Sequence, residues 1–125
     1  IDPRSAFTAD GRFDASIVET AWPETALKTF TPDPFTAVVT LTHVGHIDDE
    51  ALAISLRSPC RYIGALGSRK THAKRVERLV ALGFKDADIA RIKSPVGLNI
   101  GAETPAEIAV AILGEVIAAF RGGKA

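Results

Sequence analysis

Short runs of β-branched and other apolar residues mark the segments of this chain that we predict to be strands. The run at 37–41 is apolar at nearly every position, which is typical of a strand covered on both faces. Shorter apolar runs at 17–21 and 60–63 predict two further strands. At residues 1–4 an apolar residue precedes Asp-Pro-Arg, which indicates the end of another strand running into a turn.

Helical patterns lie between and after these strands. Pro23 and Glu24 suit the first turn of a helix in which Leu27 and Phe30 would face inward. Acidic residues crowd the first turn of a second helix, expected at 48–57, where they complement the helix dipole. Further helices are expected at 69–82, at 86–92 and, starting with both a capping box and a proline, at 105–121.

The alternation of strands and helices predicts right-handed βαβ units and a parallel sheet. The expected fold class is α/β: a doubly wound, Rossmann-like parallel sheet in one domain at 1–121, followed by a disordered tail at 122–125. Because the pattern begins at a strand end, the sheet apparently lacks its first βα unit. An unfilled gap would leave strand edges unpaired. We therefore expect a bound upstream segment, a neighbouring chain or a rearrangement to fill it.

Composition mainly excludes classes of protein. The chain has 125 residues, 15 basic and 15 acidic side chains and 46% hydrophobic residues, as expected of one ordinary soluble domain. Balanced charge argues against a nucleic-acid-binding protein, and no apolar run is long enough for a membrane span. The single Cys60 cannot form an internal disulfide and is expected to be inert core in a reducing, cytoplasmic compartment. Because the chain starts at Ile1 and contains no methionine, we expect it to be a fragment.

The strongest candidate site is the glycine loop after the strand expected at 60–63. Its glycines let the backbone approach a ligand, a serine can cap the next helix, and two basic residues add charge beside the free amides of the first turn. This combination predicts an anion pocket. The alternative is an ordinary strand-to-helix turn with a solvated basic face. The candidate residues are Gly64, Gly67, Ser68, Arg69 and Lys70.

A second glycine loop, at 97–105, also leads into a helix N-terminus. Gly97, Asn99 and Gly101 could complete the same pocket from the other side, although a structural loop explains them equally well.

The helix expected at 105–121 is apolar nearly all round, so it should be covered on two sides. The large side chains are expected to face inward, and they are Ile108, Ile112, Leu113, Val116, Ile117 and Phe120. The opposite side carries a stripe of small residues, which predicts a contact with another subunit or domain and hence a homo-oligomer. The stripe consists of Ala111, Gly114 and Ala118.

His43, His46 and the acids at 48–50 resemble a metal cluster, because imidazole and carboxylate groups lie close together in the sequence. Helix capping explains the acids better. His43 follows a strand and is better explained as a ligand contact or a turn residue, so no metal site is predicted. Trp22, beside a proline, is expected to pack rather than to stack on a ligand.

Asp2 is a candidate cofactor contact for a different reason. In dinucleotide-binding folds, the acid that closes the second strand binds the ribose hydroxyls. This position keeps open an alternative, an NAD(P)-dependent oxidoreductase, although the chain has neither the phosphate-binding turn nor an obvious proton donor.

These loops and their surroundings resemble the C-terminal Rossmann-like domain of the xanthine dehydrogenase accessory factor family, XdhC/CoxI. The resemblance covers nearly the whole chain. It is strongest in YIGALGSRKTHAKR at 62–75 and GLNIGAETPAEIAVAI at 97–112, and it includes Ile-Asp-Pro-Arg at 1–4, Leu-Thr-His at 41–43 and Asp-Asp at 48–49.

The resemblance implies a maturation factor that binds the molybdenum cofactor and helps deliver it to a molybdenum hydroxylase of the xanthine dehydrogenase type. Such a protein is a chaperone rather than a catalyst. The loop with Arg69 and Lys70 would hold the molybdopterin phosphate, and Asn99 or His43 would contact the pterin ring. An NAD(P)-dependent oxidoreductase and a non-catalytic oligomerisation or interaction domain remain the alternatives.

Overall fold

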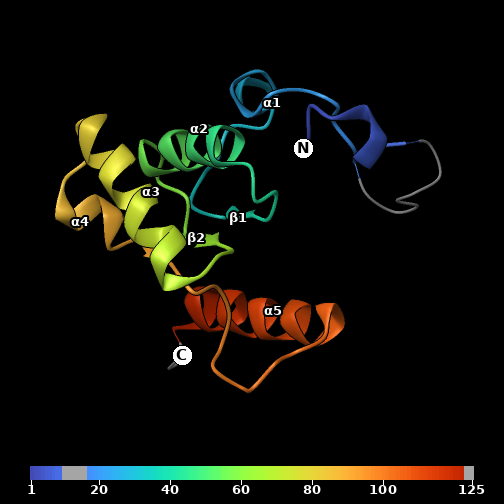
Figure 1. The fold of residues 1–125 in the computed structure, drawn as a ribbon, viewed down its shortest axis with the longest axis vertical. Helices are drawn as coiled ribbons and strands as arrows, with labels where there is room; N and C mark the ends of the chain where they lie inside the picture. The colour runs from blue at the N-terminus through green and yellow to red at the C-terminus, as the bar shows by residue number, and fades with distance from the viewer. Residues whose placement is uncertain (10–16, 123–125) are drawn as a thin grey trace.

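A computed structural model describes residues 1–9 and 17–122 of the chain. Its centre is a parallel sheet of three strands in the order β1-β2-β3 (Figure 1). Val38 of β1 pairs with Ile63 of β2, and Ile63 pairs with Ile92 of β3. The strands are β1 (Ala37–Thr40), β2 (Tyr62–Ala65) and β3 (Ile92–Lys93).

Helices cover both faces of this sheet. Figure 1 shows α2 and α3 on one side and α5 on the other, so the expected α/β, Rossmann-like class is confirmed. None of the described helices is long and apolar enough to cross a membrane. The helices are η1 (Ser5–Phe7), α1 (Pro23–Thr29), α2 (Gly45–Leu56), α3 (Arg69–Ala81), α4 (Asp86–Ile89) and α5 (Pro105–Arg121).

The hydrophobic core lies between the sheet and the two helices α2 and α3. Leu52 of α2 and Leu79 of α3 are fully buried there, against Ile63 in the middle strand. Because β2 is buried along its whole length, its carboxyl end and the loop that follows are held on a rigid base. The remaining members of this core are Leu56, Cys60, Ala65 and Ile92.

One predicted strand is absent, and one strand that forms was not predicted. Residues 17–20 form no strand, and Ile17 is exposed. Ile92, expected at the end of a helix, belongs to β3, which is too short to show a sequence period. Gly64 lies inside β2 rather than in the following loop. A Cβ at Gly64 would lie 2.6 Å from Val96 Cγ2, so the sheet needs a glycine there.

The buried side of α5 is only partly the one expected, because Ile112 is buried as predicted but other members of the expected inner side are not. Leu113 and Ile117 are 60% and 59% exposed, whereas Ala111 is buried. A Cβ at Gly114 would lie 2.8 Å from Leu98 Cδ1, because the segment after β3 crosses the helix closely at this point. The small-residue stripe therefore packs, at Ala111 and Gly114, against the chain's own loop. Phe30, also expected to face inward, is exposed at the end of α1.

The outer edge of β1 faces a groove of about 800 Å³. Consecutive residues at 36–43 line it, so the groove runs along the edge of the strand and not across one face. The opposite wall includes Ile1, Asp2 and Arg4. No strand of the described part of the chain pairs with this edge, so the expected rearrangement was wrong. An upstream segment or a neighbouring chain at this edge stays a prediction, and the expected tail at 123–125 lies outside the described residues.

Candidate functional site

The loop at 66–68 connects the buried strand β2 to α3. The Ser68 Oγ accepts a hydrogen bond from Thr71 N at 3.1 Å, so the expected helix cap is confirmed. Gly67 has φ +141°, a conformation that side chains rarely adopt. Arg69 and Lys70 are exposed in the first turn of α3. The loop thus presents a helix N-terminus and two basic side chains at the carboxyl end of the sheet.

Arg75 lies buried beneath this loop. The residue is only 3% exposed, and its Nη2 donates a hydrogen bond to the Leu66 carbonyl at 3.0 Å. Burial lowers the pKa of Arg75, and the nearby charges of Asp48 and Asp49 oppose that shift. The ion pairs seen among the described residues do not include Arg75. Its positive charge is therefore directed at the loop without a contacting carboxylate, an arrangement that favours an anion nearby.

The sequence reasoning missed Arg75 as a functional residue. The signal was present, because Ser68, His72, Arg75 and Leu79 follow one another at spacings of three or four and therefore share a helix face. Leu79 is fully buried, so an arginine on the same face had to be buried as well.

His72 makes the stability of the protein depend on pH. Its Nδ1 lies 3.1 Å from Nη1 of Arg75, and because an arginine can only donate, this imidazole nitrogen accepts and the ring is neutral. Burial, with a smaller contribution from the Arg75 charge, lowers the pKa of His72. A lowered folded-state pKa means that the unfolded chain binds the proton more readily.

We therefore expect the free energy of unfolding to fall as pH drops below about 6.5, the unperturbed histidine pKa. Urea denaturation between pH 8 and pH 5 measures this effect. His72→Gln, which keeps an acceptor but cannot titrate, should flatten the pH profile over this range. An unchanged profile in that variant would contradict the assignment.

The second glycine loop is tied to β2 through α5. Gly97 N donates to Glu115 Oε1 at 3.1 Å, and the hydroxyl of Tyr62 donates to the same oxygen at 2.7 Å. Burial, and next the hydrogen bond to Glu115, raises the pKa of Tyr62, so its hydroxyl keeps the proton that it donates. Leu98 N also donates to the Ala111 carbonyl. The second glycine loop is thus joined to the first residue of β2, at the end of the strand opposite the loop at 66–68.

The outer parts of the two loops are not joined in this way. Asn99 and Gly101 are exposed, and neither has a hydrogen bond to the loop at 66–68 within the described residues. In Figure 1 the orange segment that contains them runs past α5 and away from the start of α3. Closure of one pocket by both loops stays a prediction.

Asp2 and His43 lie in the groove beside β1. The Asp2 carboxylate accepts three hydrogen bonds from Arg4, one from its backbone N and two from its guanidinium, at 2.7–2.9 Å. This contact lowers the pKa of Asp2. Both carboxylate oxygens are engaged, so a ribose contact would require this ion pair to open. His43, directly beyond β1, lines the groove with a positive φ of 60°.

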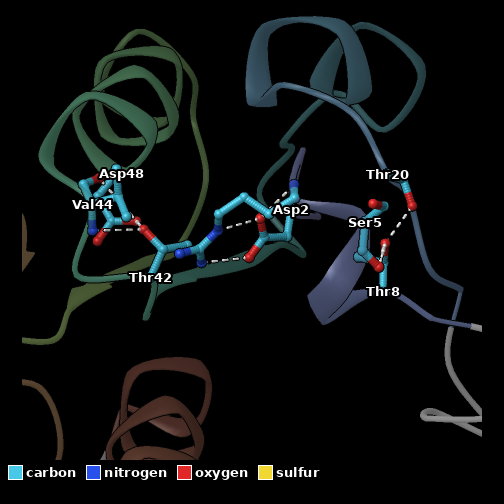
Figure 2. Close-up of polar contacts among 8 residues, drawn as sticks. Asp2, Ser5, Thr8, Thr20, Thr42, Val44 and Asp48 are labelled. Atoms are coloured by element: carbon cyan, nitrogen blue, oxygen red, sulfur yellow. Dashed lines mark hydrogen bonds and ion pairs between the residues drawn. The ribbon is translucent and has the colours of Figure 1, made fainter.

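Asp48 and Thr40 are polar groups in the same groove that sequence reasoning did not select. Asp48 is 3% exposed, and its Oδ1 accepts from the Thr42 hydroxyl at 2.6 Å (Figure 2). The hydroxyl of Thr40 is buried and has no partner among the described residues. Asp48 was assigned to the helix dipole, but Leu52 and Ser55, one and two turns later, mark its face as buried.

The other weak candidates have structural roles here. Asp49 pairs with Arg78, and no three His, Cys, Asp or Glu side chains in the described part of the chain are grouped so that they could hold a metal. Cys60 is buried in the core, and the Trp22 ring packs beside that of His46 at 5.5 Å between centroids.

Comparison with known proteins places these features in a family. Residues 1–116 match the model of the XdhC Rossmann domain. The chain is 37% identical over 117 residues to a probable xanthine dehydrogenase subunit from Bacillus subtilis (strain 168), covering 93% of this chain and 33% of that protein. It is 33% identical over 84 residues to the molybdenum cofactor insertion chaperone PaoD of Escherichia coli (strain K12), covering 67% and 26%.

A solved structure agrees with this assignment. The crystal structure of a xanthine dehydrogenase from Bacillus halodurans superposes with a TM-score of 0.66 at 34% identity, covering 85% of this chain and 30% of that one. The chain spans about a third or less of the length of each of these relatives. The match of the family model over nearly all of its length shows that the chain belongs to the XdhC Rossmann domain family.

Proposed function

We propose that this domain binds the molybdenum cofactor and helps to insert it into a molybdenum hydroxylase of the xanthine dehydrogenase type. It acts as an accessory chaperone and not as a catalyst. The observation that carries the proposal is the buried Arg75 beneath a glycine loop that opens into the N-terminus of α3. The likeness to PaoD, a molybdenum cofactor insertion chaperone, supports the choice of ligand.

The residues of this loop suit the phosphate of molybdopterin. Gly67 and Ser68 bring backbone amides and a hydroxyl to the site, while the exposed Arg69 and Lys70 supply charge from solvent. Gly64, inside the strand, provides the close approach of Val96 rather than a ligand contact. Gly97, Asn99, Gly101 and His43 are the proposed contacts to the rest of the cofactor. The bound cofactor supplies the molybdenum centre that the acceptor hydroxylase uses.

The proposed partners are the acceptor hydroxylase and the segment or second copy of the chain that completes the sheet. The open edge of β1 is expected to pair with a companion segment or with a second copy of the chain. We propose the cytoplasm as the site of action, where the buried Cys60 stays a thiol.

Arg69→Ala is expected to weaken cofactor retention by about 10- to 100-fold, the loss of one charge-assisted contact. Because Arg69 is exposed, the variant should fold normally. Native mass spectrometry of protein purified from cells that make the cofactor measures retention. Arg121→Ala, at the far end of α5, removes the same charge away from the loop and should retain the cofactor.

Unchanged retention in Arg69→Ala would refute the phosphate assignment. A protein that carries NAD or NADP in the same spectrum would favour the oxidoreductase alternative, although the Asp2 carboxylate is already engaged by Arg4. A protein with no ligand and an obligate oligomeric mass would favour an interaction domain.

A further inference from the structure

Asp48 is a buried carboxylate whose capacity to accept hydrogen bonds is largely unused. The ion pairs observed in the described ranges join Arg4 to Asp2 and Arg78 to Asp49, so neither includes Asp48. Its one hydrogen bond comes from the hydroxyl of Thr42. An ionised carboxylate has about four lone-pair sites. The charges of Arg4 and Arg75 act on Asp48 from nearby, but among the described residues their guanidinium groups make their hydrogen bonds elsewhere. A buried carboxylate whose charge is balanced in this way still has lone pairs free for N–H or O–H donors in direct contact.

A second polar group points to a ligand at the same place. The hydroxyl of Thr40, at the end of β1, is buried and unpartnered, and both Thr40 and Asp48 line the groove of about 800 Å³. Leaving such a group unsatisfied lowers stability, and a ligand with polar atoms would recover that loss. The groove extends along the whole edge of β1, so a small ligand at the carboxyl end of the strand would fill only part of this volume.

The surroundings favour a flat ligand. Apolar side chains of β1 and α2, including Val39 and Ile47, form walls beside these polar groups. In Figure 2 Asp2 lies on the other side of the groove from Thr42 and Asp48, with the guanidinium of Arg4 that it binds between them. The polar groups gather at the carboxyl end of β1, where parallel sheets bind their ligands, and this leaves the strand edge at 37–39 free for a pairing strand.

We propose that Asp48 recognises the two adjacent N–H donors of a 2-amino-4-oxopyrimidine ring, as found in a pterin. A carboxylate matches two parallel N–H groups, which is the geometry of its pairs with arginine. The Thr40 hydroxyl would hydrogen-bond to the same ring. This inference rests on the proposed function, since it makes Asp48 the specificity-determining contact for the pterin part of the cofactor.

The test uses two ring systems that differ at one group. Pterin carries the 2-amino group, whereas lumazine carries an oxygen there and would present an acceptor to the carboxylate. We expect calorimetry with the full chain to show pterin bound at least tenfold more tightly than lumazine. Asp48→Asn should weaken pterin binding at least tenfold and abolish the preference. Asp49→Asn changes the neighbouring acid, which is paired with Arg78, and should leave both affinities unchanged within twofold.

A second variant separates ligand binding from folding. Thr40→Val removes the unpartnered hydroxyl, so the free protein should be as stable as the wild type or more stable, whereas pterin binding should weaken severalfold. Circular dichroism confirms that each variant folds. Guanosine carries the same 2-amino-4-oxopyrimidine edge as pterin. Comparing the two affinities shows whether the natural ligand is a nucleotide or a pterin. Binding of either compound that depends on Asp48 supports recognition of this edge.

Equal binding of pterin and lumazine, or pterin binding that survives Asp48→Asn, would overturn the inference. Neither free ring carries a phosphate, so the result is independent of the loop at 66–68. Loss of Asp48-dependent binding with intact cofactor retention defeats this inference alone. Asp48-dependent pterin binding without cofactor retention defeats the proposed function alone.

Discussion

Glu115→Leu is expected to lower the free energy of unfolding by about 2–4 kcal/mol, because it leaves one buried and one part-buried donor without an acceptor, and a buried donor alone costs about 1–3 kcal/mol. These donors are the Tyr62 hydroxyl, in a residue only 2% exposed, and the amide of Gly97. Leucine fills a volume similar to that of the glutamate, so a cavity contributes little. Urea denaturation at pH 7 measures the change.

Two further variants isolate the cause. Glu115→Gln keeps the side-chain oxygen as an acceptor and should cost much less than the leucine. Combining Glu115→Leu with Tyr62→Phe removes both members of one hydrogen bond, and the double variant should recover part of the loss. If Glu115→Leu proved as stable as the wild type, desolvation of the carboxylate would outweigh its two hydrogen bonds, and the link between the second glycine loop and β2 would have no energetic role.

Local rules predicted the starts of α3 and α5 correctly, whereas α2 begins at Gly45, before the expected start at Asp48, and α4 ends at Ile89, before the expected end at Ile92. The start of α3 follows from the Ser68 cap, and the start of α5 follows from a capping box, in which Thr104 and Glu107 accept from each other's backbone N–H groups. Both signals depend on residues within three positions of one another, so no tertiary information is needed. The two glycine loops were located for the same reason.

Features that depend on contacts distant in the sequence could not be predicted in this way. β3 exists because Ile92 pairs with Ile63, and a strand of two residues has no period of its own. Glu115 meets Tyr62 across 53 residues of sequence, so neither residue alone indicates a polar link. The orientation of α5 was missed because its apolar residues surround the helix, and the crossing of Leu98 over Gly114 decides which side is covered.

The candidate site was predicted in part. Ser68 and Gly67 were placed correctly at the turn into α3, but the two buried charges were not recognised: Asp48 was assigned to helix capping, and Arg75 was not singled out. Charged residues on helices are usually exposed, so the helical spacing of these two from Leu52 and Leu79 was a weak signal until the packing of α2 and α3 on the sheet was known.

Val38→Pro and Val39→Pro are expected to differ sharply, although the two residues are neighbours in β1. Leu66 N donates to the Thr40 carbonyl, and successive peptide groups of a strand point in opposite directions. The N–H of Val38 therefore faces β2, whereas that of Val39 faces the groove. Val38→Pro removes a ladder hydrogen bond and should cost about 2–4 kcal/mol in the chain alone.

Val39→Pro removes an N–H group that no described strand accepts, so a chain with an open edge should tolerate it. Where a second copy or a companion segment covers the edge, the same substitution should disrupt pairing. Unfolding midpoints of the isolated chain, with masses from light scattering for the assembled protein, measure the two effects. Equal losses for both variants in the isolated chain would contradict the orientation of β1. An assembled protein indifferent to Val39→Pro would show that the edge at 37–39 is not where the partner pairs.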